Sequence, residues 1–182
     1  MTTLVFSPNW LGDAVMALPA IADIRRHAGS GRLLVAARTA VAGLMSLACG
    51  ADGVVTLAGN GRFGAVRRLG QDIRAIRASG ADVAILLPNS MRVAFVAARA
   101  GIAERWGYRR DVRRVLLSRA VPRPSVNLHQ VDDYRHLVAA LGFGNGPREP
   151  ELTVPADAVE SARRLLVECG WTGDRRLVGI AP

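Results

Sequence analysis

The sequence predicts an α/β protein in which a parallel β-sheet carries helices on both faces, a Rossmann-like layout. Short apolar runs alternate along the chain with longer segments of helical periodicity. These runs are apolar at successive positions, so helices are expected to cover both faces of the strands. Right-handed crossovers then give a doubly wound sheet, with its ligand crevice at the carboxyl ends of the strands.

The first part of the chain supplies five expected strands. They are Thr3–Ser7, Leu33–Ala37, Gly53–Leu57, Val83–Leu87 and Glu104–Tyr108. Helices are expected between the strands, because apolar side chains recur there at three- and four-residue spacing. They cover Asp13–His27, Val41–Ala48, the segment from Val66 to Ile76, and Met91–Ala100.

The second part of the chain is expected to hold a domain boundary. Arg119–Gln130 has the composition of a loop, and Val131–Leu141 has that of a helix. Gly142–Pro150, rich in glycine and proline, is typical of an interdomain linker. Residues 1–150 are therefore expected to form one Rossmann-like domain. Residues 151–182 are expected to supply a linker helix and the first strand, Leu177–Ala181, of a second domain that is truncated.

The composition is that of a folded, strongly basic protein. Half of the 182 residues are hydrophobic and 21% are charged, which excludes a disordered chain. The 24 basic residues are all arginine and face 15 acidic ones, for a net charge of +9. Coding bias is one explanation. The other is an anionic partner, such as phosphate, an acidic glycan, nucleic acid or an anionic lipid surface.

The cysteine positions and the lengths of the apolar stretches argue against a disulfide-rich protein, a zinc protein and a membrane-spanning protein. Cys49 and Cys169 lie far apart, so neither a disulfide scaffold nor a cysteine-built zinc site is expected, and a reducing cytosol fits the chain. No uncharged apolar stretch is long enough to predict a transmembrane helix.

The turn after the first expected strand carries a candidate catalytic carboxylate. Gly12 is expected to allow a tight turn, and Asp13 to open the helix, either as an N-cap or first-turn aspartate that the helix dipole favours or as a general base at the crevice. Trp10 either stacks on the apolar face of a sugar or covers the sheet edge. The glycine pattern of a dinucleotide-binding or Walker A loop is lacking.

A second candidate site follows the fourth expected strand. Asn89 or Ser90 is a suitable helix cap, and with Arg92 the helix N-terminus could bind an anion. The stretch Arg105–Arg123 then holds seven arginines against a single acidic residue, Asp111. Such a run is either a solvated face or an anion-binding surface.

The helix expected at Val131 begins beside a histidine. His129 could form a dyad or a metal pair with Asp132 or Asp133, or these aspartates could simply face the helix dipole. No second histidine or cysteine lies at metal-binding spacing, so no metal site is expected.

Together these segments resemble a known family. Asn9-Trp10-Leu11-Gly12-Asp13 with Leu18-Pro19 is similar to the opening motif of the ADP-heptose–lipopolysaccharide heptosyltransferases, glycosyltransferase family 9, most of all to the heptosyltransferase II type. Three later segments resemble further blocks of the family in the same order. They are Leu86–Ser90 with Ala100–Ile102 and Arg105–Tyr108, then His129–Tyr134, and finally Val178–Pro182.

The resemblance implies a GT-B architecture of two Rossmann-like domains, the N-terminal one for the acceptor and the C-terminal one for the donor. It implies inverting transfer of heptose from ADP-L-glycero-D-manno-heptose to the inner core of lipopolysaccharide, without a cofactor or metal. Asp13 falls on the general base. The implied acceptor-side residues are Asn9, Trp10, Gly12, Asn89, Ser90, Arg92, Arg109, Arg110, Arg113, His129 and Gln130.

The resemblance also implies the partners. The acceptor is a phosphorylated Kdo–lipid A, so the protein is expected in the cytoplasm, peripheral to the inner face of the inner membrane, with no nucleic acid bound. The donor ADP-heptose needs the missing C-terminal domain, so this chain alone is expected to be inactive. Two alternatives stay open: a family 9 enzyme with another acceptor or nucleotide sugar, and a non-catalytic basic module that binds anionic glycan or nucleic acid.

Overall fold

The computed structural model describes residues 1–47, 50–58, 64–144 and 146–180. Cys49 and Ala181, which enter the expectations above, lie outside these ranges. The chain divides into two compact units, Met1–Leu152 and Thr153–Pro182, and each is described by itself.

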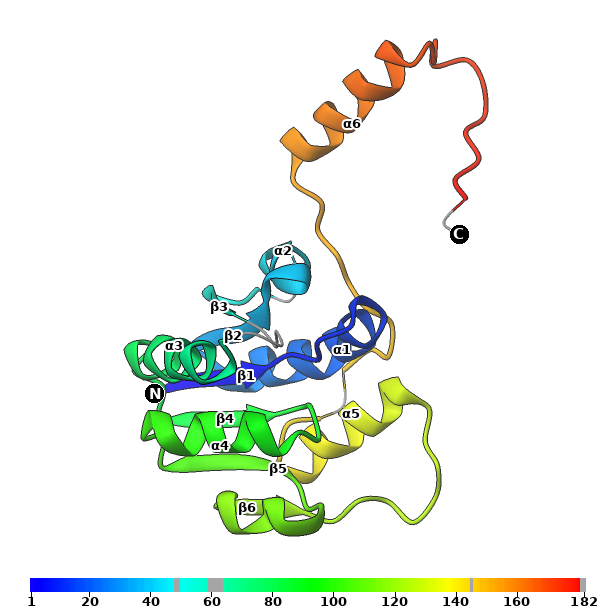
Figure 1. The fold of residues 1–182 in the computed structure, drawn as a ribbon. Helices are drawn as coiled ribbons and strands as arrows, with labels where there is room; N and C mark the ends of the chain where they lie inside the picture. The colour runs from blue at the N-terminus through cyan, green and yellow to red at the C-terminus, as the bar shows by residue number, and fades with distance from the viewer. Residues whose placement is uncertain (48–49, 59–63, 145, 181–182) are drawn as a thin grey trace. The chain divides into compact units, whose positions relative to one another are not determined.

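A six-stranded parallel sheet forms the centre of the first unit (Figure 1). Its strands, in spatial order, are β3 (Gly53–Leu57), β2 (Arg32–Arg38), β1 (Thr2–Phe6), β4 (Val83–Leu86), β5 (Glu104–Tyr108) and β6 (Arg119–Val121). Val5 of β1 lies opposite Val35 of β2 and Ile85 of β4, so β1 is hydrogen-bonded on both sides. The predicted fold class, a Rossmann-like α/β sheet, is confirmed.

Helices cover both faces of this sheet. One layer holds α1 (Leu11–Ala28), α2 (Thr39–Leu47) and α5 (Gln130–Ala140); the other holds α3 (Ala65–Ala78), α4 (Met91–Ala100) and the short 3₁₀ helix η1 (Asp111–Leu116). Side chains of each strand alternate between the two layers. In β1, for example, Val5 packs under α1 while Leu4 and Phe6 pack under α4.

The stretch expected to be a loop, residues 119–130, is the first correction. It begins with β6, which pairs in parallel with β5 through Trp106 opposite Arg119 and Tyr108 opposite Val121. A three-residue edge strand that begins with arginine and is followed by proline is too short to give a period-2 pattern, which is why the sequence did not predict it. The 3₁₀ helix η1 was not predicted either.

The second unit corrects the prediction for the C-terminus. Its helix α6 (Ala156–Glu168) has no buried residue, and the expected strand is wrong, because residues 177–180 have no regular structure. A parallel strand forms only beside a partner that accepts its hydrogen bonds, and the described part of this unit contains none. Nowhere in the described ranges does a helix reach the length and apolarity needed to cross a bilayer.

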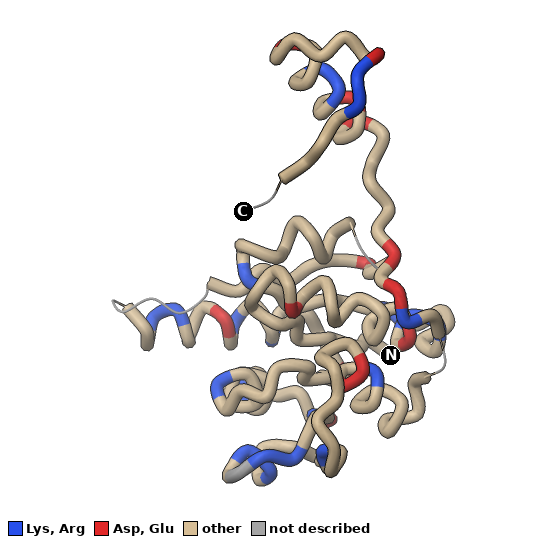
Figure 2. Tube along the Cα trace, turned by 90° about the vertical axis from the view of Figure 1, so that its right-hand side faces the viewer, with Lys and Arg blue, Asp and Glu red and all other residues tan. Residues whose placement is uncertain are grey.

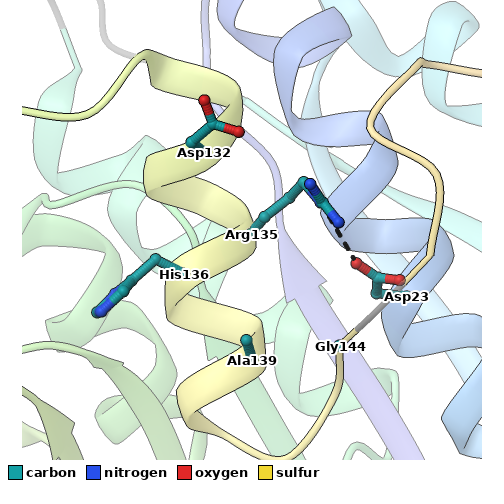
Figure 3. Close-up of a pocket in the computed structure, with 6 residues that line it drawn as sticks. All are labelled: Asp23, Asp132, Arg135, His136, Ala139 and Gly144. Carbon is teal, nitrogen blue, oxygen red and sulfur yellow. Dashed lines mark ion pairs between the residues drawn. The ribbon is translucent and has the colours of Figure 1, made fainter.

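A buried carboxylate fixes the chain where it leaves the first unit. Asp23 of α1 is only 1% exposed; its Oδ1 accepts hydrogen bonds from Arg26 and from the backbone N–H of Gly146, the latter at 2.9 Å. Arg135 of α5 forms an ion pair with it, with Nε 3.9 Å from Oδ2, and its Nη2 donates to the Gly146 carbonyl; both side chains line a cavity of about 240 Å³ (Figure 3). Asp23 therefore ties α1, α5 and the segment after α5 together.

We expect Asp23→Ala to lower the free energy of unfolding by about 3–5 kcal/mol, because it leaves Arg135 and the Gly146 N–H without their buried partner. Urea unfolding measures the change. Glu149→Ala removes the same charge from an exposed position and is expected to stay within about 0.5 kcal/mol of the parent. Equal stability of the two variants would contradict the role of Asp23.

Candidate functional site

The candidate site lies where the winding of the sheet reverses. β1 and β4 are neighbours, but the helices that follow them, α1 and α4, lie on opposite faces. The turn after β1 and the turn after β4 therefore diverge at the carboxyl edge of the sheet, which is where parallel α/β sheets of this kind bind ligands. These are the two segments, Ser7–Asp13 and Pro88–Arg92, that the sequence predicts to hold a site.

Asp13 lies in the first turn of α1 and is half-buried. The helix begins at Leu11 with Trp10 in the cap position, so Asp13 is a first-turn residue and does not cap the helix. Of the residues that the structure describes, none donates a hydrogen bond to its carboxylate or forms an ion pair with it. The helix dipole favours the ionised carboxylate, which leaves a charged oxygen available to a ligand.

Tyr134 of α5 is the electrostatic neighbour of Asp13. Its side chain is buried, and burial raises the pKa of the phenol; the negative charges of Asp13 and Asp133 raise it further, while a hydrogen bond from Gln130 opposes the shift. The Tyr134 phenol is therefore neutral near pH 7. Two of the segments that resemble family blocks, Asn9–Asp13 and His129–Tyr134, thus lie together in the structure, with Gln130 and Tyr134 beside Asp13.

Trp10 and Gly12 present an open surface next to Asp13. The Trp10 ring is 78% exposed, so it covers little of the sheet edge, contrary to one of the two expectations for it. Gly12 is helical without a positive φ, and a Cβ on it would meet no atom within 4 Å. The expectation that Gly12 allows a tight turn is therefore wrong. Its lack of a side chain instead leaves room above the first turn of α1.

Arg113 of η1 is a buried cation beneath the turn that follows β4. It is 2% exposed; its Nη1 donates to Asn89 Oδ1 at 3.2 Å, and its Nη2 lies 3.4 Å from the Leu86 carbonyl oxygen. Its Nε has no partner, and no carboxylate of the described residues pairs with it. Burial lowers the pKa of Arg113 to about 10, so the guanidinium stays charged at neutral pH.

Arg113 lines a cavity of about 300 Å³ that an anion could enter. Asn89, Met91, Arg110 and Val112 form its other walls. A solvated face is therefore the wrong interpretation for Arg113, although Arg109 and Arg110 are exposed. Arg113 is a buried guanidinium whose Nε lacks a hydrogen-bond partner, and it lies beside the N-terminus of α4. Such a group is suited to bind a phosphate or carboxylate.

Gly107 makes room for this arginine. A Cβ at Gly107 would lie 2.8 Å from Arg113 Nη2 and 3.2 Å from the Leu86 carbonyl oxygen. Sequence reasoning missed this pair, although a glycine inside a strand, between Trp106 and Tyr108, is the kind of signal that marks a close approach.

Arg92 is held by another residue that the sequence did not reveal. Its Nη2 donates to Asp72 Oδ2 at 2.7 Å, and the other oxygen of the buried Asp72 accepts from the Ala58 N–H at 2.8 Å. Ser90 occupies the cap position of α4, but its side chain makes no capping bond. The positive charge of Arg92 is thus matched within the fold, unlike that of Arg113.

His129 caps α5 and does not form a dyad. Its Nδ1 accepts from the Val131 N–H at 3.4 Å. Asp132 binds Arg148 at 3.0 Å, and Asp133 binds Arg123 at 3.3 Å, so arginines hold both carboxylates. The hydrogen bonds from Arg148 lower the pKa of Asp132.

Comparison with known proteins agrees with this geometry. The profile described as glycosyltransferase family 9 (heptosyltransferase) matches residues 66–182. The chain belongs to glycosyltransferase family 9. It is 25% identical to lipooligosaccharide heptosyltransferase 2 of Haemophilus influenzae and, equally, to that of Haemophilus ducreyi; each match covers all of this chain and 54% of the relative. The chain thus spans about half the length of these relatives.

Solved structures share the fold of this family 9 chain. A family 9 glycosyltransferase from Veillonella parvula superposes with a TM-score of 0.83 at 18% identity, over 95% of this chain and 50% of that one. The heptosyltransferase II of Escherichia coli gives 0.70 at 21% identity, over 96% and 52%. The sheet corresponds to the N-terminal half of a GT-B glycosyltransferase, as the resemblance implies.

We expect Gly107→Ala to lower the free energy of unfolding by about 1–3 kcal/mol, because the added methyl group overpacks the site against the Arg113 guanidinium. Thermal and urea unfolding measure it. Gly53→Ala is the matched strand control, since its Cβ would meet only a Leu34 methyl group, at 3.3 Å. Adding Arg113→Ala is expected to remove part of the penalty. A penalty that Arg113→Ala leaves unchanged would show that the guanidinium is not the obstacle.

Proposed function

We propose that this chain is the acceptor half of an enzyme that transfers heptose from ADP-L-glycero-D-manno-heptose to the inner core of lipopolysaccharide, with inversion. Membership of family 9 and similarity to two heptosyltransferases named for lipooligosaccharide support it. On this proposal residues 1–150 hold the phosphorylated Kdo–lipid A acceptor. Residues 151–182 begin the nucleotide-sugar domain, so the chain alone is inactive.

The half-buried carboxylate of Asp13 carries the proposal. It lies in the first turn of α1, just after the carboxyl end of β1, and has no hydrogen-bond or ion-pair partner among the described residues. In the proposed reaction the acceptor hydroxyl oxygen attacks the anomeric carbon of heptose from the face opposite ADP. Its proton passes to the Asp13 carboxylate as the new C–O bond forms, and the bond to ADP breaks with its electron pair on the departing phosphate. Attack from the opposite face inverts the anomeric centre.

Acceptor recognition is proposed for the residues around this carboxylate. Arg113 and Asn89 would bind a phosphate or a Kdo carboxylate in the 300 Å³ cavity, which Arg110 also lines. The exposed Arg109 precedes Arg110 in the chain and is proposed to contact the acceptor as well. The exposed ring of Trp10 suits stacking on a sugar face.

A further group of residues is assigned to the acceptor on the family resemblance alone. These residues are Asn9, Gly12, Ser90, Arg92, His129 and Gln130. Because the acceptor is lipid-linked, we place the enzyme in the cytoplasm, peripheral to the inner face of the inner membrane.

In the full-length protein, Asp13→Asn is expected to reduce the transfer rate by about 10²-fold or more, since the amide cannot take the proton. Radiolabelled or mass-spectrometric transfer assays with ADP-heptose measure the rate. Stability and acceptor binding are expected to stay close to the parent. Near-normal turnover of this variant would remove Asp13 from the role of base.

Gly12→Ala separates a functional role from a structural one. The position is helical and open, so the methyl group is expected to leave stability equal or up to about 1 kcal/mol higher. If the acceptor needs the space beside Asp13, its KM is expected to rise several-fold. Gly43→Ala in α2, a helical glycine with equally open surroundings, is the control and should change stability alone. Equal kinetics for both variants would mean that the acceptor does not approach Gly12.

A further inference from the structure

We propose that one face of the first unit docks on an anionic lipid bilayer, a partner surface that rests on the lipid-linked acceptor of the proposed function. This docking face is formed by the first turns of α3 and α4 and by η1. Its residues are Val66, Arg67, Arg68, Met91, Phe95, Val112, Arg114 and Val115.

Large apolar side chains project from the docking face. Val66 is 85% exposed, Val112 68% and Val115 77%, and Met91 and Phe95 are also exposed. Val112 and Val115 are three residues apart on a 3₁₀ helix, which places them on the same side of it. These residues belong to three separate elements and yet share one surface.

Two hollows join these elements. An apolar groove of about 430 Å³ runs between α3 and α4, with Val66, Leu69, Met91 and Phe95 among its walls. The cavity that holds Arg113 lies between α4 and η1, and Met91 lines it too. Because Met91 borders both hollows, the exposed apolar side chains of α3 and η1 flank a continuous surface.

Arginines alternate with these apolar side chains. Arg67 and Arg68 follow Val66, and Arg114 lies between Val112 and Val115. None of these three arginines forms an ion pair with a described residue. The nearby carboxylate of Asp72 is buried and already bound to Arg92. Figure 2 marks the arginines in blue and the acidic residues in red along the chain.

This alternation fits a bilayer better than a protein partner. The dry core of a protein interface is depleted in charge, and burying these arginines there would strip them of water without a carboxylate on this chain to compensate. At a membrane surface the guanidinium groups meet lipid phosphates while single valine and methionine side chains enter the headgroup–acyl boundary. The docking face is positively charged, as the partner of an anionic surface must be, and arginines interrupt its exposed apolar side chains.

The position of the docking face also suits the chemistry. Met91 and Val112, two residues of the docking face, also line the cavity that holds Asn89 and Arg113. A saccharide that emerges from the bilayer on a lipid anchor would therefore meet the proposed acceptor site as soon as the face docks.

Vesicle co-sedimentation of the 182-residue chain tests the proposal without any lipopolysaccharide precursor. We expect binding to vesicles of phosphatidylcholine with about one third phosphatidylglycerol, weakening as salt rises, and little binding to phosphatidylcholine alone. The pair Arg67→Gln/Arg114→Gln is expected to lower the partition coefficient by roughly 10-fold or more, and Val66→Asn/Val115→Asn, at two exposed valines outside the acceptor cavity, by several-fold. Circular dichroism checks that these exposed substitutions leave the fold intact.

Matched controls lie on α6, where Arg163→Gln/Arg164→Gln removes the same charge and Val159→Asn replaces a valine that is 55% exposed. We expect the controls to bind nearly as the parent does. Absence of binding to anionic vesicles at low salt, or an equal loss in the control variants, would overturn the docking face.

A second assay separates this proposal from the proposed function. In the full-length enzyme, the docking variants are expected to transfer heptose at the parent rate to a water-soluble heptose–Kdo acceptor and several-fold more slowly to an acceptor embedded in vesicles. Equal rates with both acceptors would overturn the docking face and leave the transferase proposal standing. A parent enzyme that transfers to neither acceptor would refute the proposed function, while the vesicle-binding result still decides on docking.

Discussion

The central strand β1 is hydrogen-bonded to β2 on one side and to β4 on the other, and both of its faces are buried. The chain continues from β1 to β2 on one side and from β4 to β5 on the other, so right-handed crossovers send the helices after β1 and β4 to opposite faces of the sheet. The turns that lead to Asp13 and Asn89 therefore diverge at the carboxyl edge of two neighbouring strands. The apolar side chains of β1 thus determine where chemistry can occur, although none of them touches a ligand.

Buried charges then connect the outer elements to this centre. Asp23 joins α1 to α5, Asp72 joins α3 to α4, and Asp133 holds Arg123 near β6. Each of these carboxylates has its charge met within the fold. Arg113 differs from them, because its burial is matched only by a side-chain amide and a backbone carbonyl. A charge left incompletely satisfied at a crevice is a common property of ligand sites.

Much of this organisation could be predicted from the sequence. Three elements, Gly53–Leu57, Met91–Ala100 and Glu104–Tyr108, have the predicted bounds, because their apolar spacing is regular and glycine or proline lies near their ends. β6 and η1 were missed, because a short edge strand and a 3₁₀ turn have no periodicity of their own. The burial of Arg113 could not be seen, since it depends on space left by Gly107 in the next strand. The partnership of Asp13 and Tyr134 joins residues over 100 positions apart in the chain, and only the packing of α1 on α5 creates it.

The hold of Asp23 on Gly146 has a mechanical consequence. The backbone is fixed to α1 at that point, and two residues later the Arg148 side chain is held by Asp132. Glu149, Pro150, Glu151 and Leu152 complete the first unit. A pull on this end of the unit therefore acts on α1 and α5 together, through Asp23 and Asp132.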